Sequence, residues 1–259
     1  MPSLQLIGMV HLDPLPGSPR YRPPMETLIR NAVDDARMLE SAGFDALLVE
    51  NYGDAPYFAD QVPEVTVAGM SRVVSEIRNA VDLPLGINVL RNDALAALSI
   101  AAACEAGFIR VNVLSGSMYT DQGFIEGKAA QLVRLRDHLC PEVEVLADVF
   151  VKHATPPTGL RITEAARDLW HRAMADALIV SGPATGYPAD REAIEGIRSA
   201  IPEARILAGS GMTAERVPEL VGLVDGAIVG TGIKEDGDIH RPVDLARATA
   251  LVGAVAAGE

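Results

Sequence analysis

The sequence predicts an α/β fold, a single (β/α)8 TIM barrel, from three observations. Eight short apolar runs are spread along the 259 residues, and segments with helical periodicity lie between them. Near-continuous apolar strands joined by helices indicate a parallel sheet covered on both faces. Eight such units match the size of this barrel, about 250 residues. No linker divides residues 1–259, so we expect one domain; a doubly wound open sheet is the alternative, although no G-x-G-x-x-G follows the first run.

The expected elements follow one another in order. The eight strands are residues 4–10, 46–49, 83–89, 108–113, 143–151, 177–180, 205–208 and 226–229. The clearest helix is residues 28–41, whose apolar positions recur at helical spacing. Gly43 and Gly107 each follow a helical run and precede a strand, as glycine does at helix C-termini. Residues 115–127 have no strong pattern, and we expect a lid or binding loop there.

The composition argues against some classes of binding partner. The chain has 35 acidic and 22 basic side chains, a net charge of -13, and no basic run. Such a surface repels phosphate backbones and anionic lipids, so we expect neither nucleic acid nor membrane surfaces as partners. No apolar run reaches the roughly 18 residues of a membrane span. Two cysteines without a paired motif and an N-terminus without a signal-peptide pattern favour a cytoplasmic location.

Polar residues gather where the strands end, which is where barrel enzymes carry their active sites. Glu50 is the first candidate for a general acid/base, and Asp148 and Lys152 are the others. Each has an alternative role: Glu50 as a capping or ion-paired acid, Asp148 as a structural partner of Arg110, and Lys152 as a Schiff-base amine or an ion-pair partner of Asp148 or Glu50. The expected substrate-binding residues are His11, Asn88, Arg110, Asn112, Ser181 and Thr185.

Glycine-rich tripeptides follow the last two expected strands, and Thr213 is expected to open a helix after the first of them. Small residues allow backbone N–H groups to approach an anion, and a helix N-terminus adds a favourable dipole. Loops after the seventh and eighth strands are the usual phosphate site of this fold. The alternative is that the glycines only permit tight turns. The predicted phosphate-binding residues are Gly209, Ser210, Gly211, Gly230, Thr231, Gly232 and Lys234.

The sequence contains no strong metal signature. It has no H-x-H, no H-E-x-x-H and no cysteine cluster, so we predict no cofactor. His11, Glu50 and Asp148 come from different strands and could converge on a divalent metal.

These motifs together resemble the BtpA family, which includes the SgcQ proteins. The resemblance covers nearly the whole chain and rests on residues 8–17, 49–54, 86–92, 109–112, 121–123, 147–153, 209–211 and 230–234. It implies a barrel of the ribulose-phosphate-binding type. The family is named after a factor in photosystem I biogenesis, and its members are mostly labelled predicted enzymes or nucleosidases.

Two functions remain open at this stage. The first is an enzyme acting on a phosphorylated sugar or nucleoside by nucleosidase, lyase or isomerase chemistry, with acid/base groups in the barrel mouth. The second is a non-catalytic assembly or stability factor, as the family name implies. The polar strand ends favour the enzyme, and barrels of this kind often form homo-oligomers, which we also expect here.

Overall fold

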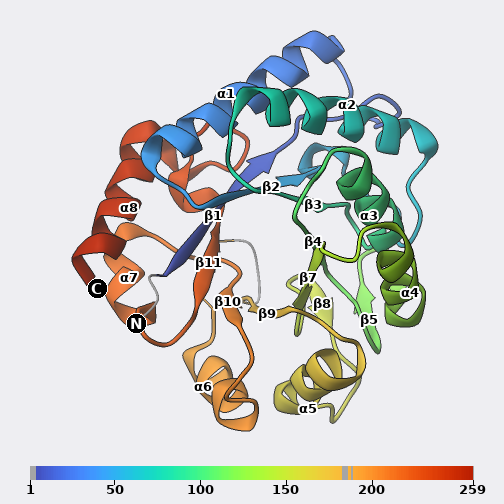
Figure 1. Ribbon diagram of the computed structural model, residues 1–259, viewed down its shortest axis with the longest axis vertical. Helices are drawn as coiled ribbons and strands as arrows, with labels where there is room; N and C mark the ends of the chain where they lie inside the picture. Colours follow the sequence, from blue (N-terminus) through green and yellow to red (C-terminus); the bar gives the residue numbers. More distant parts are fainter. Residues whose placement is uncertain (1–3, 183–185, 188, 259) are drawn as a thin grey trace.

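The computed structural model describes residues 4–182, 186–187 and 189–258. Eight parallel strands close into a barrel in the order β1, β2, β3, β4, β7, β9, β10 and β11, and β11 pairs back onto β1 (Figure 1). Their bounds are Gln5–His11, Ala46–Glu50, Leu85–Asn88, Phe108–Val111, Glu144–Asp148, Ala177–Val180, Ile206–Ala208 and Gly226–Val229. Each lies on one of the eight expected strands, so the predicted barrel is confirmed and the open-sheet alternative is not.

Helices surround the barrel between successive strands (Figure 1). They are α1 Met25–Ala42, α2 Glu64–Ala80, α3 Ala94–Ala103, α4 Ala129–Leu139, α5 Ile162–Arg167, α6 Arg191–Ala200, α7 Val217–Leu220 and α8 Leu245–Gly258. Gly43 ends α1 in the left-handed region, at φ 94°, as predicted. Gly107 does not end α3 in this way. The helix ends earlier, Glu105 takes the positive φ of 55°, and the Gly107 N–H donates to the Leu85 carbonyl at the start of the strand pair. No helix among the described residues is long and apolar enough to cross a membrane.

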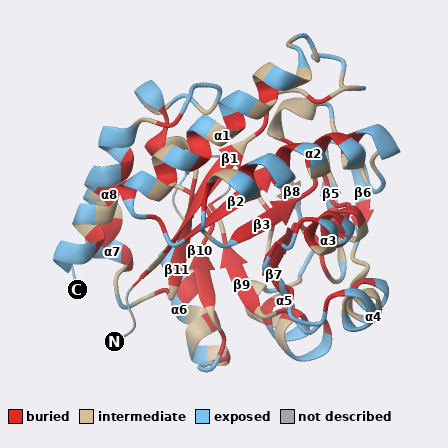
Figure 2. Cartoon of the chain, turned by 45° about the horizontal axis from the view of Figure 1, so that its top comes forward, coloured by how far each residue is buried: buried red, intermediate tan, exposed pale blue. Residues whose placement is uncertain are grey.

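Alternate strand positions fill the inside of the barrel. The apolar residues there form one cluster, made of Ile7, Met9, Ala46, Leu48, Phe108, Leu146, Ala177, Ile179, Leu207 and Ile228. The other strand face packs against the helices in a larger cluster. Figure 2 shows the strands buried along their length, while the helices expose their outer faces. This two-sided burial explains why the strands are almost entirely apolar.

Gly86 leaves the space that the Phe108 ring occupies inside the barrel. A Cβ atom built on Gly86 would overlap three atoms of that ring. We therefore expect Gly86→Ala to lower the free energy of unfolding by about 1–3 kcal/mol, as overpacking does. The control is Gly253→Ala in α8, where a Cβ meets nothing within 4 Å and a gain of about 1 kcal/mol in helix propensity is expected. Urea unfolding of both variants checks this; equal stabilities would contradict it.

Residues 115–127 form a β-hairpin rather than an irregular loop. Strands β5 Ser117–Thr120 and β6 Gly123–Glu126 pair antiparallel, and β8 Ala154–Thr155, which follows β7, adds a third strand to β5. This small sheet has a core of its own, built from Val113, Met118, Ile125 and Val151. It follows the carboxyl ends of β4 and β7, so it lies on the side of the barrel where the predicted site is.

Candidate active site in the barrel mouth

Side chains alternate in direction along each strand, and this alternation places a layer of polar residues above the apolar interior of the barrel. In β1, Ile7 and Met9 point inward, so His11 at the strand end points inward as well. The same two-residue step puts Glu50 above Leu48 and Arg110 above Phe108. Neighbouring strands bring these positions together, because His11 pairs with Glu50, and Glu50 with Asn88. The sequence therefore places its polar strand ends in one layer of the barrel mouth.

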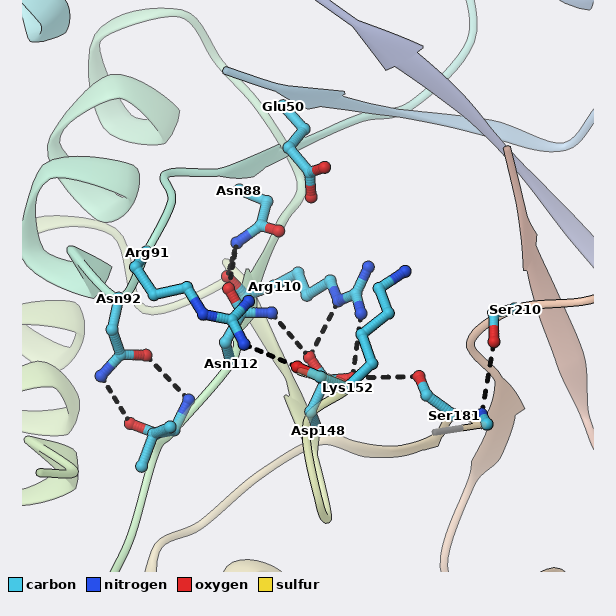
Figure 3. A network of polar contacts seen from close by, with 12 residues as sticks. Glu50, Asn88, Arg91, Asn92, Arg110, Asn112, Asp148, Lys152, Ser181 and Ser210 are labelled. Atoms are coloured by element: carbon cyan, nitrogen blue, oxygen red, sulfur yellow. Dashed lines mark hydrogen bonds and ion pairs between the residues drawn. The ribbon is translucent and has the colours of Figure 1, made fainter. Parts of the chain in front are cut away.

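Arg110 and Asp148 form a buried ion pair within this layer. Two parallel hydrogen bonds join them, from Arg110 Nε to Asp148 Oδ2 at 3.0 Å and from Arg110 Nη2 to Asp148 Oδ1 at 2.9 Å. Asp148 also accepts from Asn112 Nδ2 at 2.9 Å and from Ser181 Oγ at 3.4 Å. Asn88 Nδ2 donates to the Arg110 carbonyl at 3.1 Å and to Asn112 Oδ1 at 3.3 Å (Figure 3). Asp148 is thus fully engaged by Arg110, Asn112 and Ser181.

A cavity of about 210 Å³ opens above this network. Its lining includes Glu50, Lys152, His11 and Arg110 from the polar layer, together with two glycine loops, residues 209–211 after β10 and residues 230–232 after β11. In Figure 3 the Glu50 carboxylate, the Arg110 guanidinium and the Lys152 amine are turned toward one another. The cavity is therefore lined by a carboxylic acid, by two cationic side chains and by the backbone of the two glycine loops.

Glu50 is a buried carboxyl group that forms no ion pair with a lysine or arginine among the described residues. Its Oε1 atom lies 3.9 Å from His11 Nε2. Burial raises the pKa of Glu50 above its ordinary value, and the nearby Arg110 and Lys152 oppose that rise. Burial and the charge of Lys234 hold the pKa of His11 well below its ordinary value, so the imidazole is neutral near pH 7. A carboxyl with a raised pKa beside a neutral imidazole can serve as a general acid or base.

Lys152 brings an amine into the same cavity from the segment after β7. Among the described residues it forms no ion pair with Asp148 or Glu50, so neither expected pair is present. Burial, and then the charge of Arg110, lowers the pKa of Lys152 to about 8. Arg91 fixes this segment, since its Nη2 donates to the Lys152 carbonyl at 2.6 Å. Lys152 is partly buried, and an amine with this pKa loses its proton readily just above neutral pH.

The two glycine loops offer unpaired backbone donors. The N–H groups of Gly211, Met212, Thr231 and Gly232 have no hydrogen-bond acceptor among the described residues. Thr213 precedes the 3₁₀ turn η3 Ala214–Arg216, which runs directly into the four-residue helix α7, and the 3₁₀ turn η4 Thr231–Ile233 overlaps the second loop. These elements are too short to supply the dipole of the helix expected after Thr213. Anion binding here would depend on the N–H groups themselves.

Packing also requires several of these glycines. A Cβ on Gly209 would overlap Ser181 Oγ, and a Cβ on Gly232 would overlap the Met212 carbonyl. Gly211 adopts φ 70°, which favours glycine. The tight-turn explanation therefore applies to these glycines, and the anion-binding explanation stays a prediction. Glycine substitutions would perturb the fold together with any ligand site.

Two of the predicted phosphate-binding side chains are engaged elsewhere. Lys234 is buried and donates from Nζ to Asp35 Oδ2 in α1 at 2.6 Å, and it does not line the cavity with the glycine loops. Ser210 Oγ donates to the Tyr187 carbonyl at 2.6 Å and accepts from Gly182 N at 3.3 Å. A cation that the sequence analysis missed, Arg247 in the first turn of α8, lines the cavity instead.

The remaining predicted site residues lie in two places. His11, Glu50, Arg110 and Lys152 line the mouth cavity, whereas Asn88, Asn112, Asp148 and Ser181 lie in the network below it. Thr185 lies outside the described residues. No group of three or more His, Cys, Asp or Glu residues that could hold a metal occurs in the described part of the chain; His11 and Glu50 adjoin, but Asp148 is bound to Arg110.

Fold and site together define a (β/α)8-barrel protein with an acid, an amine and open backbone donors at the carboxyl ends of its strands. The chain belongs to the BtpA family, whose family model matches residues 3–257. It is 50% identical to an uncharacterized protein of Thermococcus kodakarensis, over 95% of this chain and 93% of that one. It is 42% identical to the photosystem I biogenesis protein BtpA of Synechocystis, over 98% of this chain and 88% of that one. The SgcQ protein of Escherichia coli is 30% identical, over 93% and 90%.

Solved structures support the barrel. A tryptophan synthase structure of Mycobacterium tuberculosis superimposes with a TM-score of 0.64 at 15% identity, covering 98% of this chain and 93% of that one. The phosphoribosyl anthranilate isomerase of Thermus thermophilus gives 0.60 at 12% identity, covering 99% and 100%. At such identities the likeness shows the fold alone.

Proposed function

We propose that this protein is an enzyme that binds a phosphorylated sugar or nucleoside in the barrel mouth. Its chemistry is proton transfer of the nucleosidase, lyase or isomerase type. Glu50 and Lys152 are the proposed acid/base pair, and the loops after β10 and β11 hold the phosphate with Arg247 beside them. Asp148, which we predicted as catalytic, becomes a positioning residue for Arg110.

One observation carries this proposal: Glu50, Lys152 and the two glycine loops line one cavity. Burying a carboxyl and an amine without a direct ion pair costs stability, so their joint presence needs a reason beyond folding. The phosphoryl group would meet backbone N–H donors and cations at one side, while the acid and the amine face the sugar. An assembly factor, the role named for the Synechocystis relative, would not require this arrangement.

A thermal-shift experiment with ribose 5-phosphate, inorganic phosphate and ribose tests the binding. We expect ribose 5-phosphate to stabilise the protein most, by about 2.7 kcal/mol at a concentration one hundred times its Kd, and ribose to have no effect. Arg247→Met should weaken the shift, because the lost guanidinium lines the cavity. Arg167→Met, at the exposed end of α5, is the matched control. Equal shifts with ribose and ribose 5-phosphate would contradict the phosphate site.

A further inference from the structure

A second and larger cavity adjoins the barrel mouth. It measures about 520 Å³, within the usual range for small-molecule sites of roughly 300–1,000 Å³. Its walls come from the end of β1, from α1, from residues 52–57 after β2, and from residues 234–242 before α8. His11 and Ile239 line both this cavity and the mouth cavity, so the two spaces meet at these side chains.

Aromatic rings gather where the two cavities meet. The Tyr52 ring lies edge-on to His11, with centroids 5.1 Å apart, and 5.8 Å from the His240 ring. Tyr57 supports this group, because its hydroxyl donates to the Tyr52 carbonyl at 2.7 Å. Tyr52 is only partly buried and His240 is exposed, so both present ring surface to the cavity they line. Such faces stack on a planar ring.

The charged lining of this cavity comprises three carboxylates, which are Asp13, Asp34 and Asp35, and the cations Arg20, Lys234 and Arg241. Arg241 is paired with Asp236. Asp13 accepts one hydrogen bond, from Asn31 Nδ2 at 2.9 Å, and Asp34 forms no ion pair with any described residue. Asp35 is already bound to Lys234 and to the Val243 N–H, so it is not free for a ligand. Free carboxylates beside aromatic faces suit a ring that carries N–H donors more than a plain hydrocarbon ring.

His11 carries an unsatisfied atom at the junction. Its side chain is 7% exposed and its Nε2 faces Glu50 at 3.9 Å, but its buried Nδ1 has no hydrogen-bond partner among the described residues. A buried polar atom without a partner lowers the stability of the fold, so in a native structure it calls for an explanation. A Cβ on Gly230 would lie 2.8 Å from His11 Cε1, so the glycine loop also makes room for this ring.

We propose that the second cavity is the subsite for a planar nitrogen heterocycle of the substrate. The ligand then is a nucleotide-like compound: its phosphate at the glycine loops, its sugar beneath Glu50 and Lys152, and its ring against the Tyr52 and His240 side chains. This inference rests on the proposed function, because it is the phosphorylated sugar in the mouth that carries the ring. His11 lies at the point where sugar and ring are joined, next to the proposed acid.

Calorimetric titration of the whole chain with AMP, GMP, UMP and ribose 5-phosphate tests the subsite. We expect at least one nucleotide to bind about tenfold or more tightly than ribose 5-phosphate. Tyr52→Leu and His240→Ala should each remove most of that advantage and leave the affinity for ribose 5-phosphate unchanged. Tyr119→Leu, an exposed ring on the β5 hairpin, is the matched control, and His240→Ala keeps the test open if Tyr52→Leu fails to fold, since His240 is exposed.

The outcomes separate this inference from the proposed function. If all nucleotides bind no more tightly than ribose 5-phosphate, the heterocycle subsite is wrong and the phosphate site stands. If a nucleotide binds more tightly but neither variant changes that, the ring lies elsewhere and the subsite is again wrong. If neither the nucleotides nor ribose 5-phosphate bind, the proposed function is wrong, and this inference, which rests on it, is wrong as well.

Discussion

Replacing Asp148 with alanine is expected to lower the free energy of unfolding by about 3–5 kcal/mol. The variant would leave the Arg110 guanidinium, whose side chain is 2% exposed, without the carboxylate that takes two of its hydrogen bonds. Asn112 and Ser181 would lose an acceptor at the same time. A buried cation without a partner is far more costly than the absence of both charges.

Urea unfolding with a double-mutant cycle measures this effect. The double variant Arg110→Met with Asp148→Leu removes both charges and should be much less destabilised than Asp148→Ala. The matched surface control is Asp168→Ala, which breaks the exposed pair with Arg172, 3.6 Å long, and should cost less than about 1 kcal/mol. If Asp148→Ala costs no more than this control, then Arg110 does not depend on Asp148.

The barrel was predictable because its signals are local. Each strand is a short apolar run, and the polar residues that follow these runs marked the strand ends where the mouth cavity lies. The rule that buried charges are usually paired suggested Arg110 as the structural partner of Asp148, and this ion pair is present. The third strand of the small sheet, β8, escaped prediction because it pairs with residues of β5 that lie 34 and 36 positions earlier, and no local pattern indicates that pairing.

The phosphate side chains were less predictable, because a neighbour in the sequence is not always a neighbour in the site. Lys234 follows the glycine loop closely, yet it pairs with Asp35, 199 residues away. Arg247 reaches the cavity from the next helix, and only its position in the first turn of an expected helix could have suggested it. Backbone donors, by contrast, follow directly from the glycine-rich loops, where N–H groups without an acceptor occur among the described residues. Phosphate binding by these groups stays a prediction.

Replacing Lys152 with methionine is expected to stabilise the protein at pH 7 by up to about 3 kcal/mol. The pKa of this amine falls from an ordinary value of 10.5 to about 8 in the folded chain, and one pKa unit corresponds to about 1.4 kcal/mol. Folding therefore opposes the charged amine in full below pH 8, where both states hold the proton. As the pH rises from 8 to 10.5, the folded state has lost a proton that the unfolded state still holds, so this cost disappears.

Urea unfolding of the wild type and Lys152→Met at pH 7 and at pH 9.5 checks both sign and size. The stability advantage of the variant should be less than half as large at pH 9.5. Lys128→Met, which removes a partly exposed lysine bound to Asp60, is the matched control and should give no such gain. We also expect Lys152→Met to lose binding of ribose 5-phosphate. A side chain that costs stability and is needed for binding is kept for function, whereas a destabilised variant that still binds ribose 5-phosphate would make Lys152 a structural residue.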